Sequence, residues 1–356
     1  MESLRLGVLE GDGIGPEIVP PTLRAMEAAS AAAGAPAIEW VSLPSGWRGL
    51  EEHDTTLPEI THQTLGELVG WVVGPHDSSG YPPEWVKALS PHARLRRDYE
   101  LYANIRPARN LPGVAAVTEG LDLVIVRENT EGFYSDNAMF RGSGQFMPTP
   151  DLALNVGVFS DRAGRRIAHE AFRLAQRRRG RVTVVHKSLL RQSLGRYLDI
   201  AEEVAEEYPD VELDEVKVDA ATVHLVRDPA RFDVLLTENM HGDILSDLAG
   251  ELAGALGLSP SINAGHDRAM AQAAHGCAPD IAGHGIANPT GMMLSGAMLL
   301  TWLGTRAGTD AYADAGRRVR DAVHAALAAG HGTGDLGGSD DTAGFGQAVV
   351  DRITEG

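Results

Sequence analysis

Short uninterrupted apolar runs alternate along the chain with longer stretches in which apolar residues recur at helical spacing. The short runs predict buried strands at residues 4–9, 68–73, 121–126, 182–185 and 232–236. The longer stretches, rich in Ala and Arg, predict helices at residues 21–33, 163–178, 190–207 and 310–329. Strands that alternate with helices predict an α/β architecture.

Residues 136–150 fit neither pattern. They are rich in Gly, Met and Pro, and we expect a loop or an arm that packs against something else. Apolar runs such as residues 68–73 and 297–303 are shorter than the about 20 residues that cross a bilayer. The first residues lack the charged and apolar regions of a signal peptide, so a soluble protein is expected.

Length and charge narrow the function classes. A chain of 356 residues predicts two domains or one large domain. The net charge of −18 disfavours nucleic-acid and anionic-membrane partners, because both require a basic surface. The single cysteine, Cys277, excludes an intramolecular disulfide framework and a cysteine zinc cluster. Such a composition is typical of a reducing, cytoplasmic setting.

A glycine-rich turn, residues 11–17 (GDGIGPE), directly follows the first predicted strand. It lacks the G-x-G-x-x-G spacing of a Rossmann dinucleotide site. A strand, a glycine turn and a helix bring backbone N–H groups close to a ligand. A plain tight turn explains these glycines equally well.

Several basic residues are candidates for ligand binding, and Arg127 and Lys187 among them follow predicted strands. Arg96, Arg106 and Arg127 suggest a small anionic substrate, because guanidinium pairs with carboxylate through two hydrogen bonds. Lys187 ends a strand where a parallel sheet commonly carries catalytic groups. Each of these residues taken singly is more often an ordinary surface charge.

Asp243 and Asp247 are four residues apart, so on a helix they share one face. Two like charges there repel unless a cation neutralises them, and oxygen ligands suit a divalent cation. Asp219 is a plausible third ligand. A solvated helix face is the alternative.

A family resemblance is carried by three segments, residues 239–247 (NMHGDILSD), 254–258 and 335–338. The sequence resembles the β-decarboxylating dehydrogenases, the isocitrate/isopropylmalate dehydrogenase family. The resemblance implies a two-domain α/β fold with a mixed, mostly parallel sheet that is not a Rossmann fold. It implies a large cofactor-side domain of residues 1–102 plus 255–356, and a small domain of residues 103–254. It also implies a homodimer with shared active sites and a dimerisation arm at about residues 136–165.

The resemblance implies a role for each candidate residue. Arg96, Arg106 and Arg127 would clamp the malate carboxylates, with His92 facing the C3 substituent. Asp219, Asp243 and Asp247 would bind Mg²⁺ or Mn²⁺, with Asp219 serving the partner's site. Lys187, also crossing the interface, would take the C2 hydroxyl proton, and Tyr134 would protonate C3.

The cofactor implied by the resemblance is a nicotinamide dinucleotide. Asp280 and Ile281 lie where NADP-dependent members usually carry basic or aromatic residues, so we expect NAD. A carboxylate there accepts hydrogen bonds from ribose hydroxyls and repels a 2′-phosphate. The cofactor-binding residues expected are Ile14, His275, Gly276, Ala278, Asp280, Ile281 and Asn288.

Several residues depart from the family pattern. Leu189 replaces an asparagine that usually helps to place the nicotinamide, and His76 and His241 are also unusual. The stretch before Arg96, residues 89–95, carries His92 in place of apolar leucines, which favours a polar or anionic C3 substituent.

The expected activity is therefore NAD- and metal-dependent oxidative decarboxylation of a 3-substituted (R)-malate of the isocitrate, homoisocitrate or 3-isopropylmalate type. One alternative is a tartrate or D-malate dehydrogenase. A second alternative is a non-catalytic regulatory paralogue.

Overall fold

The structure is a computed structural model that describes residues 3–86, 90–140 and 142–355. Leu89 of the predicted substrate-reading stretch and Arg141 of the predicted arm lie outside the described residues. Contacts divide the chain into two compact units. The first comprises residues 1–95, 111–116 and 254–356, and the second comprises residues 96–110 and 117–253. The predicted boundary at residue 102 lies a few residues later than this division.

The first unit holds strands in the order β2-β1-β3-β12-β11. Their bounds are β1 (Leu4–Leu9), β2 (Ile38–Ser42), β3 (Gly70–Val73), β11 (Ile262–Ala264) and β12 (Ala269–Ala271). The pairs are parallel except β11 with β12. Its helices are α1 (Gly15–Ala32), α2 (Gly46–His53), α3 (Glu59–Gly66), α4 (Pro83–Val86), α10 (Thr290–Ala307), α11 (Asp310–Ala328) and α12 (Thr342–Glu355), with short 3-10 turns at Leu256–Leu258 and Gly334–Leu336. Helix α5 (Pro91–Asp98) leads from the first unit into the second.

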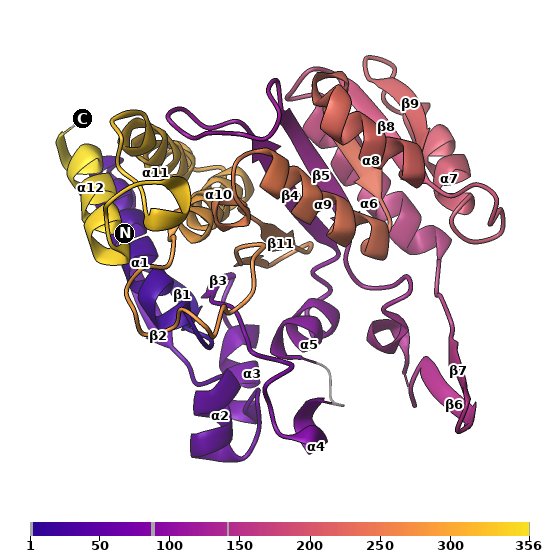
Figure 1. The fold of residues 1–356 in the computed structure, drawn as a ribbon, viewed down its shortest axis with the longest axis horizontal. Helices are drawn as coiled ribbons and strands as arrows, with labels where there is room; N and C mark the ends of the chain where they lie inside the picture. The colour runs from indigo at the N-terminus through magenta and orange to yellow at the C-terminus, as the bar shows by residue number, and fades with distance from the viewer. Residues whose placement is uncertain (1–2, 87–89, 141, 356) are drawn as a thin grey trace. The chain divides into compact units, whose positions relative to one another are not determined.

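The second unit holds strands in the order β4-β5-β10-β8-β9. Their bounds are β4 (Ala103–Arg109), β5 (Asp122–Glu128), β8 (Arg181–His186), β9 (Glu212–Lys217) and β10 (Val234–Thr237). All pairs are parallel except β4 with β5. Its helices are α6 (Asp161–Ala175), α7 (Arg196–Ala205), α8 (Val218–Arg227) and α9 (Asn239–Leu252), with 3-10 turns at Ser135–Ala138 and Pro229–Arg231. The expected mixed, mostly parallel α/β fold is confirmed (Figure 1).

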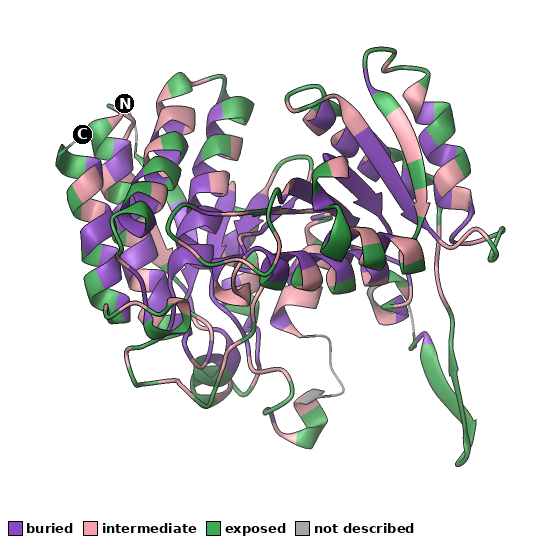
Figure 2. Ribbon diagram, turned by 45° about the horizontal axis from the view of Figure 1, so that its top comes forward, coloured by how far each residue is buried: buried purple, intermediate pink, exposed green. Residues whose placement is uncertain are grey.

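Burial on both faces explains the uninterrupted apolar runs. In β5, Val124 and Val126 belong to the core beneath α6 and α7, whereas Leu123 and Ile125 belong to the core beneath α8 and α9. Successive side chains of a strand point to opposite faces, so a strand covered on both sides needs no polar positions. Figure 2 shows these central strands as buried.

Helix boundaries deviate from the prediction where tertiary packing outweighs local signals. The first predicted helix begins at residue 21, but α1 begins at Gly15 and contains Pro20 and Pro21. Each proline removes its own backbone hydrogen bond, while Ile18 and Val19 beside them are fully buried. The helix predicted at residues 190–207 begins only at Arg196, after a run of turns.

The predicted arm contains an antiparallel hairpin, β6 (Gln145–Thr149) and β7 (Leu152–Asn155). Its pairing is irregular between Phe146 and Thr149, where Pro148 has no N–H to donate. Every residue of both strands is exposed, and Figure 2 shows this hairpin as an exposed ribbon. Sequence periodicity missed both strands, because they have only five and four residues and Pro148 interrupts the first. In the part of the chain that the structure describes, no helix is long and apolar enough to cross a membrane.

Replacing Phe172 by alanine should lower the free energy of unfolding by about 3–5 kcal/mol. Phe172 is fully buried in α6, and its ring stacks on Tyr208 with centroids 5.2 Å apart. Urea unfolding measures the loss, with Ile60→Ala, at a half-exposed position of α3, as the control. A loss equal to that of the control would show that this part of the core is not tightly packed.

Candidate active site

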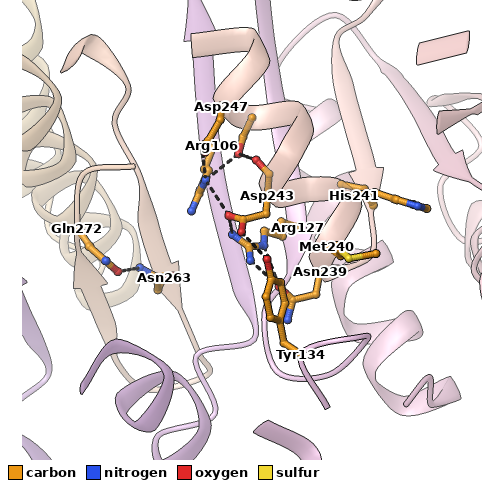
Figure 3. A network of polar contacts seen from close by, with 12 residues as sticks. Arg106, Arg127, Tyr134, Asn239, Met240, His241, Asp243, Asp247, Asn263 and Gln272 are labelled. Atoms are coloured by element: carbon orange, nitrogen blue, oxygen red, sulfur yellow. Dashed lines mark hydrogen bonds and ion pairs between the residues drawn. The ribbon is translucent and has the colours of Figure 1, made fainter. Parts of the chain in front are cut away.

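The site is built around Arg127, at the carboxyl end of β5. In the parallel pairing of β5 with β10, Arg127 lies opposite Thr237, and α9 begins two residues later at Asn239. The Nε and Nη2 atoms of Arg127 donate to Oδ1 of Asn239 at 2.9 and 2.7 Å, and Nη1 forms an ion pair with Asp243. The Arg127 side chain is only 3% exposed, so its direction is fixed (Figure 3).

Arg106 reaches the same helix from the neighbouring strand β4. Its Nη1 donates to Ser246 Oγ at 2.7 Å and to Asp247 Oδ1 at 3.2 Å, and lies 3.4 Å from Asp243 Oδ1. Asp243 and Asp247 thus lie on one face of α9, as their spacing predicts.

Gly242 permits this close approach of helix and strand. A Cβ atom at this position would lie 2.6 Å from Cγ of Arg127 and 2.7 Å from its Cβ. A larger residue would therefore displace the arginine, which explains why glycine precedes Asp243.

Tyr134 completes the group. Its hydroxyl donates to Asp243 Oδ2 at 2.8 Å, and the Arg127 guanidinium lies 5.8 Å from its ring centroid. Burial, and then the Asp243 carboxylate, raise the pKa of Tyr134 to about 12. The phenol therefore holds its proton across the neutral pH range.

Like charges shape the electrostatics of this group. Burial lowers the pKa of Arg96, and the charges of Arg127 and Arg106 lower it further. Burial also raises the pKa of Asp243, but the charges of Arg127 and Arg106 outweigh it, and the net shift is downward. Burial raises the pKa of Asp247. Three guanidiniums accompany two carboxylates, so the group retains positive charge and attracts an anion.

Lys187 and Asp219 form a second group. Lys187 follows β8, and its Nζ lies 2.8 Å from Oδ1 of Asp219, in the first turn of α8. The hydrogen bond from Lys187 lowers the pKa of Asp219. Within the described ranges, no three His, Cys, Asp or Glu side chains gather as metal ligands. The structure thus pairs Asp243 with Asp247, and Asp219 with Lys187.

His92 lies in a chain of hydrogen bonds at the start of α5. Its Nε2 lies 3.1 Å from the Gly74 carbonyl oxygen and 2.8 Å from His76 Nδ1, and His76 Nε2 lies 2.9 Å from Ser45 Oγ. Burial lowers the pKa of His76 to about 3, so this ring is neutral. His76 therefore helps to orient His92.

The glycine turn packs against the predicted cofactor loop. The Ile14 N–H donates to the Cys277 carbonyl at 2.9 Å, and a Cβ on Gly13 would collide with that carbonyl. His275, Gly276, Ala278, Asp280 and Ile281 all lie on this loop. Asp280 is exposed.

His275 and Asn288 lie at the two ends of the cofactor loop. His275 Nε2 is buried without a hydrogen-bond partner among the described residues, and burial lowers its pKa. Such an orphaned ring nitrogen fits a polar ligand. Asn288 Nδ2 donates to Asp335 Oδ2 at 3.0 Å, which joins the loop to the motif at residues 335–338.

Asn239 and Ser246 are site residues that sequence reasoning missed. Their spacing relative to Asp243, four residues before and three after, places them on the same helix face and could have revealed them. The other residues that we expect to depart from the family pattern lie in contrasting surroundings. His241 is largely buried, with Nδ1 3.3 Å from Glu238, whereas Leu189 is 81% exposed.

Citrate, a tricarboxylate, should stabilise the protein through the arginine group. At about ten times its Kd it should add about 1.4 kcal/mol to the free energy of unfolding relative to NaCl of equal ionic strength. Arg127→Gln should remove most of this increment. The control is Arg109→Gln in the same sheet, because Arg109 is half-exposed and pairs with Asp122 at 3.7 Å. Equal increments in both variants would contradict an anion site at Arg127.

Comparisons with known proteins agree over almost the whole chain. A family model described as "Isocitrate/isopropylmalate dehydrogenase" matches residues 5–349. The chain is 41% identical to an isocitrate/homoisocitrate dehydrogenase of Thermus thermophilus, covering 98% of each. It is 36% identical to a 3-isopropylmalate dehydrogenase of Archaeoglobus fulgidus, covering 98% of this chain and 99% of that one.

A solved structure extends the agreement to the fold. The crystal structure of isocitrate dehydrogenase from Methylococcus capsulatus superposes with a TM-score of 0.87 at 37% identity, covering 99% of each chain. The resemblance drawn from the sequence motifs is confirmed. The chain belongs to the isocitrate/isopropylmalate dehydrogenase family, whose members are oxidoreductases that act on hydroxy acids.

Proposed function

We propose that this protein catalyses the NAD- and divalent-metal-dependent oxidative decarboxylation of a 3-substituted (R)-malate to a 2-oxo acid and CO2. One observation carries the proposal, namely that Arg106 and Arg127 converge on Asp243 beside Tyr134. This arrangement joins anion-binding, metal-binding and proton-donating groups in a single cluster, as oxidative decarboxylation of a hydroxy acid requires.

The arginines bind the substrate carboxylates. Arg127 is held by Asn239 and Arg106 by Ser246, so both guanidiniums keep their direction before an anion arrives. A preorganised guanidinium loses little entropy when it forms paired hydrogen bonds with a carboxylate. Arg96 adds a third positive charge to the same group.

Asp243 and Asp247 would hold Mg²⁺ or Mn²⁺, with Asp219 supplied by a second copy of the chain. Carboxylate oxygens are the donors these hard cations prefer, which makes the residues a chemical fit. When bound, such a cation polarises the 2-hydroxyl and stabilises the enolate charge.

Lys187 and Tyr134 divide the proton transfers between them. Lys187 would take the proton of the C2 hydroxyl, and a nicotinamide dinucleotide, when bound, would supply the hydride acceptor. Tyr134 would donate its proton to C3 after CO2 leaves. Its raised pKa of about 12 supports this role, because the phenol stays protonated until the enolate forms. Asp243, which accepts the hydrogen bond of Tyr134, orients the phenol.

A homodimer would complete each site. Asp219 pairs with Lys187 rather than with Asp243, which supports donation of both residues to a partner's arginine group. The exposed arm carries apolar side chains that a second copy would cover. Phe146, Met147, Leu152, Leu154 and Val156 are all between 43% and 62% exposed.

The C3 substituent is polar or anionic in this proposal. His92 lies one turn before Arg96 on α5, so both side chains leave the same side of that helix. An imidazole can donate a hydrogen bond to a polar substituent or accept one from it. Apolar side chains, which suit an isopropyl group, can do neither.

A substrate panel tests the activity. Formation of NADH with Mn²⁺ or Mg²⁺ should be fastest with isocitrate, homoisocitrate or 3-phosphonomethylmalate, and slow with 3-isopropylmalate. Preference for tartrate or D-malate would establish the smaller-substrate alternative. Preference for 3-isopropylmalate would refute the role of His92. No turnover of any substrate, with NAD and metal bound, would contradict the proposed activity and favour a regulatory subunit.

NAD preference is proposed to depend on Asp280. Asp280→Lys should narrow the ratio of kcat/KM for NAD over NADP by at least about tenfold, since the lysine attracts a 2′-phosphate and the carboxylate repels it. The neighbouring exposed residue His284 provides the control variant His284→Lys. An unchanged ratio in Asp280→Lys would show that this loop position does not read the ribose.

A further inference from the structure

The loop that carries Asp280 is tied to α1 by a single carboxylate. Glu17, in the first turn of α1, accepts the N–H of Gly283 at Oε1 (2.5 Å) and the N–H of Gly285 at Oε2 (2.7 Å). At the other end of the loop, the Ile14 N–H donates to the Cys277 carbonyl. The segment between β1 and α1, together with the first turn of α1, therefore holds the loop at both ends. The two hydrogen bonds to Glu17 join residues that are 266 and 268 positions apart in the sequence.

Glycine is required on the loop side of this contact. Gly283 and Gly285 have φ angles of +80° and +68°, a backbone conformation that residues with a side chain rarely adopt. Nothing lies within 4 Å of where their Cβ atoms would be, so the glycines serve backbone conformation rather than close packing. The resulting turn directs two N–H groups toward one carboxylate.

The glutamate side of the contact is rigid. Glu17 precedes Ile18 and Val19, which are fully buried in the first unit. A half-buried carboxylate that accepts two backbone N–H groups forms charge-assisted hydrogen bonds, which are stronger than neutral ones. Glu17 thus anchors the loop to the core of the first unit.

We propose that Glu17 is a positioning residue for the nucleotide, acting through the loop of residues 277–285 without touching the adenosine itself. The inference rests on the proposed function, since it requires that Asp280 and Ile281 receive the adenosine ribose. Fixing both ends of the loop lowers the entropy that the loop loses when it binds the nucleotide. Affinity for the dinucleotide therefore depends on the carboxylate of Glu17, which is far from the loop in sequence.

Glu17→Gln tests the proposal, because it preserves the volume of the side chain and replaces one acceptor by an amide that faces a glycine N–H. The Kd for NADH, measured by fluorescence titration without substrate, should rise about tenfold. Hydrogen exchange of the segment with Gly283 and Gly285 should accelerate at the same time. The KM for the hydroxy acid should stay within about twofold, because the arginine group is untouched.

The matched control is Glu27→Gln in the same helix. Glu27 accepts from Trp40 Nε1 at 2.6 Å, away from the loop. This variant should leave NADH affinity and loop exchange unchanged. Glu17→Asp, which restores the charge on a shorter side chain, should recover part of the lost affinity.

Two results would overturn the inference. The first is unchanged NADH affinity in Glu17→Gln, whether or not the loop exchanges faster. The second is an equal loss in Glu17→Gln and Glu27→Gln, which would indicate general destabilisation of α1. A wild-type protein without affinity for NADH is a different outcome, because it would refute the proposed cofactor and the inference with it.

Discussion

The polar groups of the second unit depend on one constraint, which is that two buried arginine side chains are held close together. Arg106 and Arg127 reach one face of α9 from neighbouring strands, and Asp243 forms ion pairs with both. Their guanidiniums cannot move apart, because Asn239 and Ser246 bind them and burial excludes water. The antiparallel pairing of β4 with β5 and the parallel pairing of β5 with β10 therefore bring together the arginines of the proposed anion site.

The remaining polar groups are arranged around that charge. Tyr134 keeps its proton because it is partly buried and donates to the carboxylate that neutralises the arginines. Lys187 has its own counter-ion in Asp219. In the proposed function, one copy supplies the anion-binding and acid half of each site, and a second copy supplies the base and a metal ligand. In the first unit, the loop proposed for the nucleotide is anchored independently through Glu17 and Ile14.

Much of this was visible in the sequence, and what was not has physical reasons. The first strand was predicted to the residue, and the spacing of Asp243 and Asp247 correctly indicated one helix face. The start of α1 was missed because its prolines argue against a helix that packing stabilises, and the hairpin of the arm was missed because its strands are short and wholly exposed. The contacts of Glu17 with Gly283 and Gly285 join distant segments, and no periodicity encodes them.

The central claim is that a complete site combines Lys187 of one copy with the arginine and carboxylate group of another. Lys187→Ala and Asp243→Asn should each be inactive alone. Co-folded in equal amounts, they should recover roughly a quarter of wild-type NADH formation, since half of randomly paired dimers are hybrids and each hybrid holds one intact site. Hybrid dimers that form and remain inactive would contradict the claim.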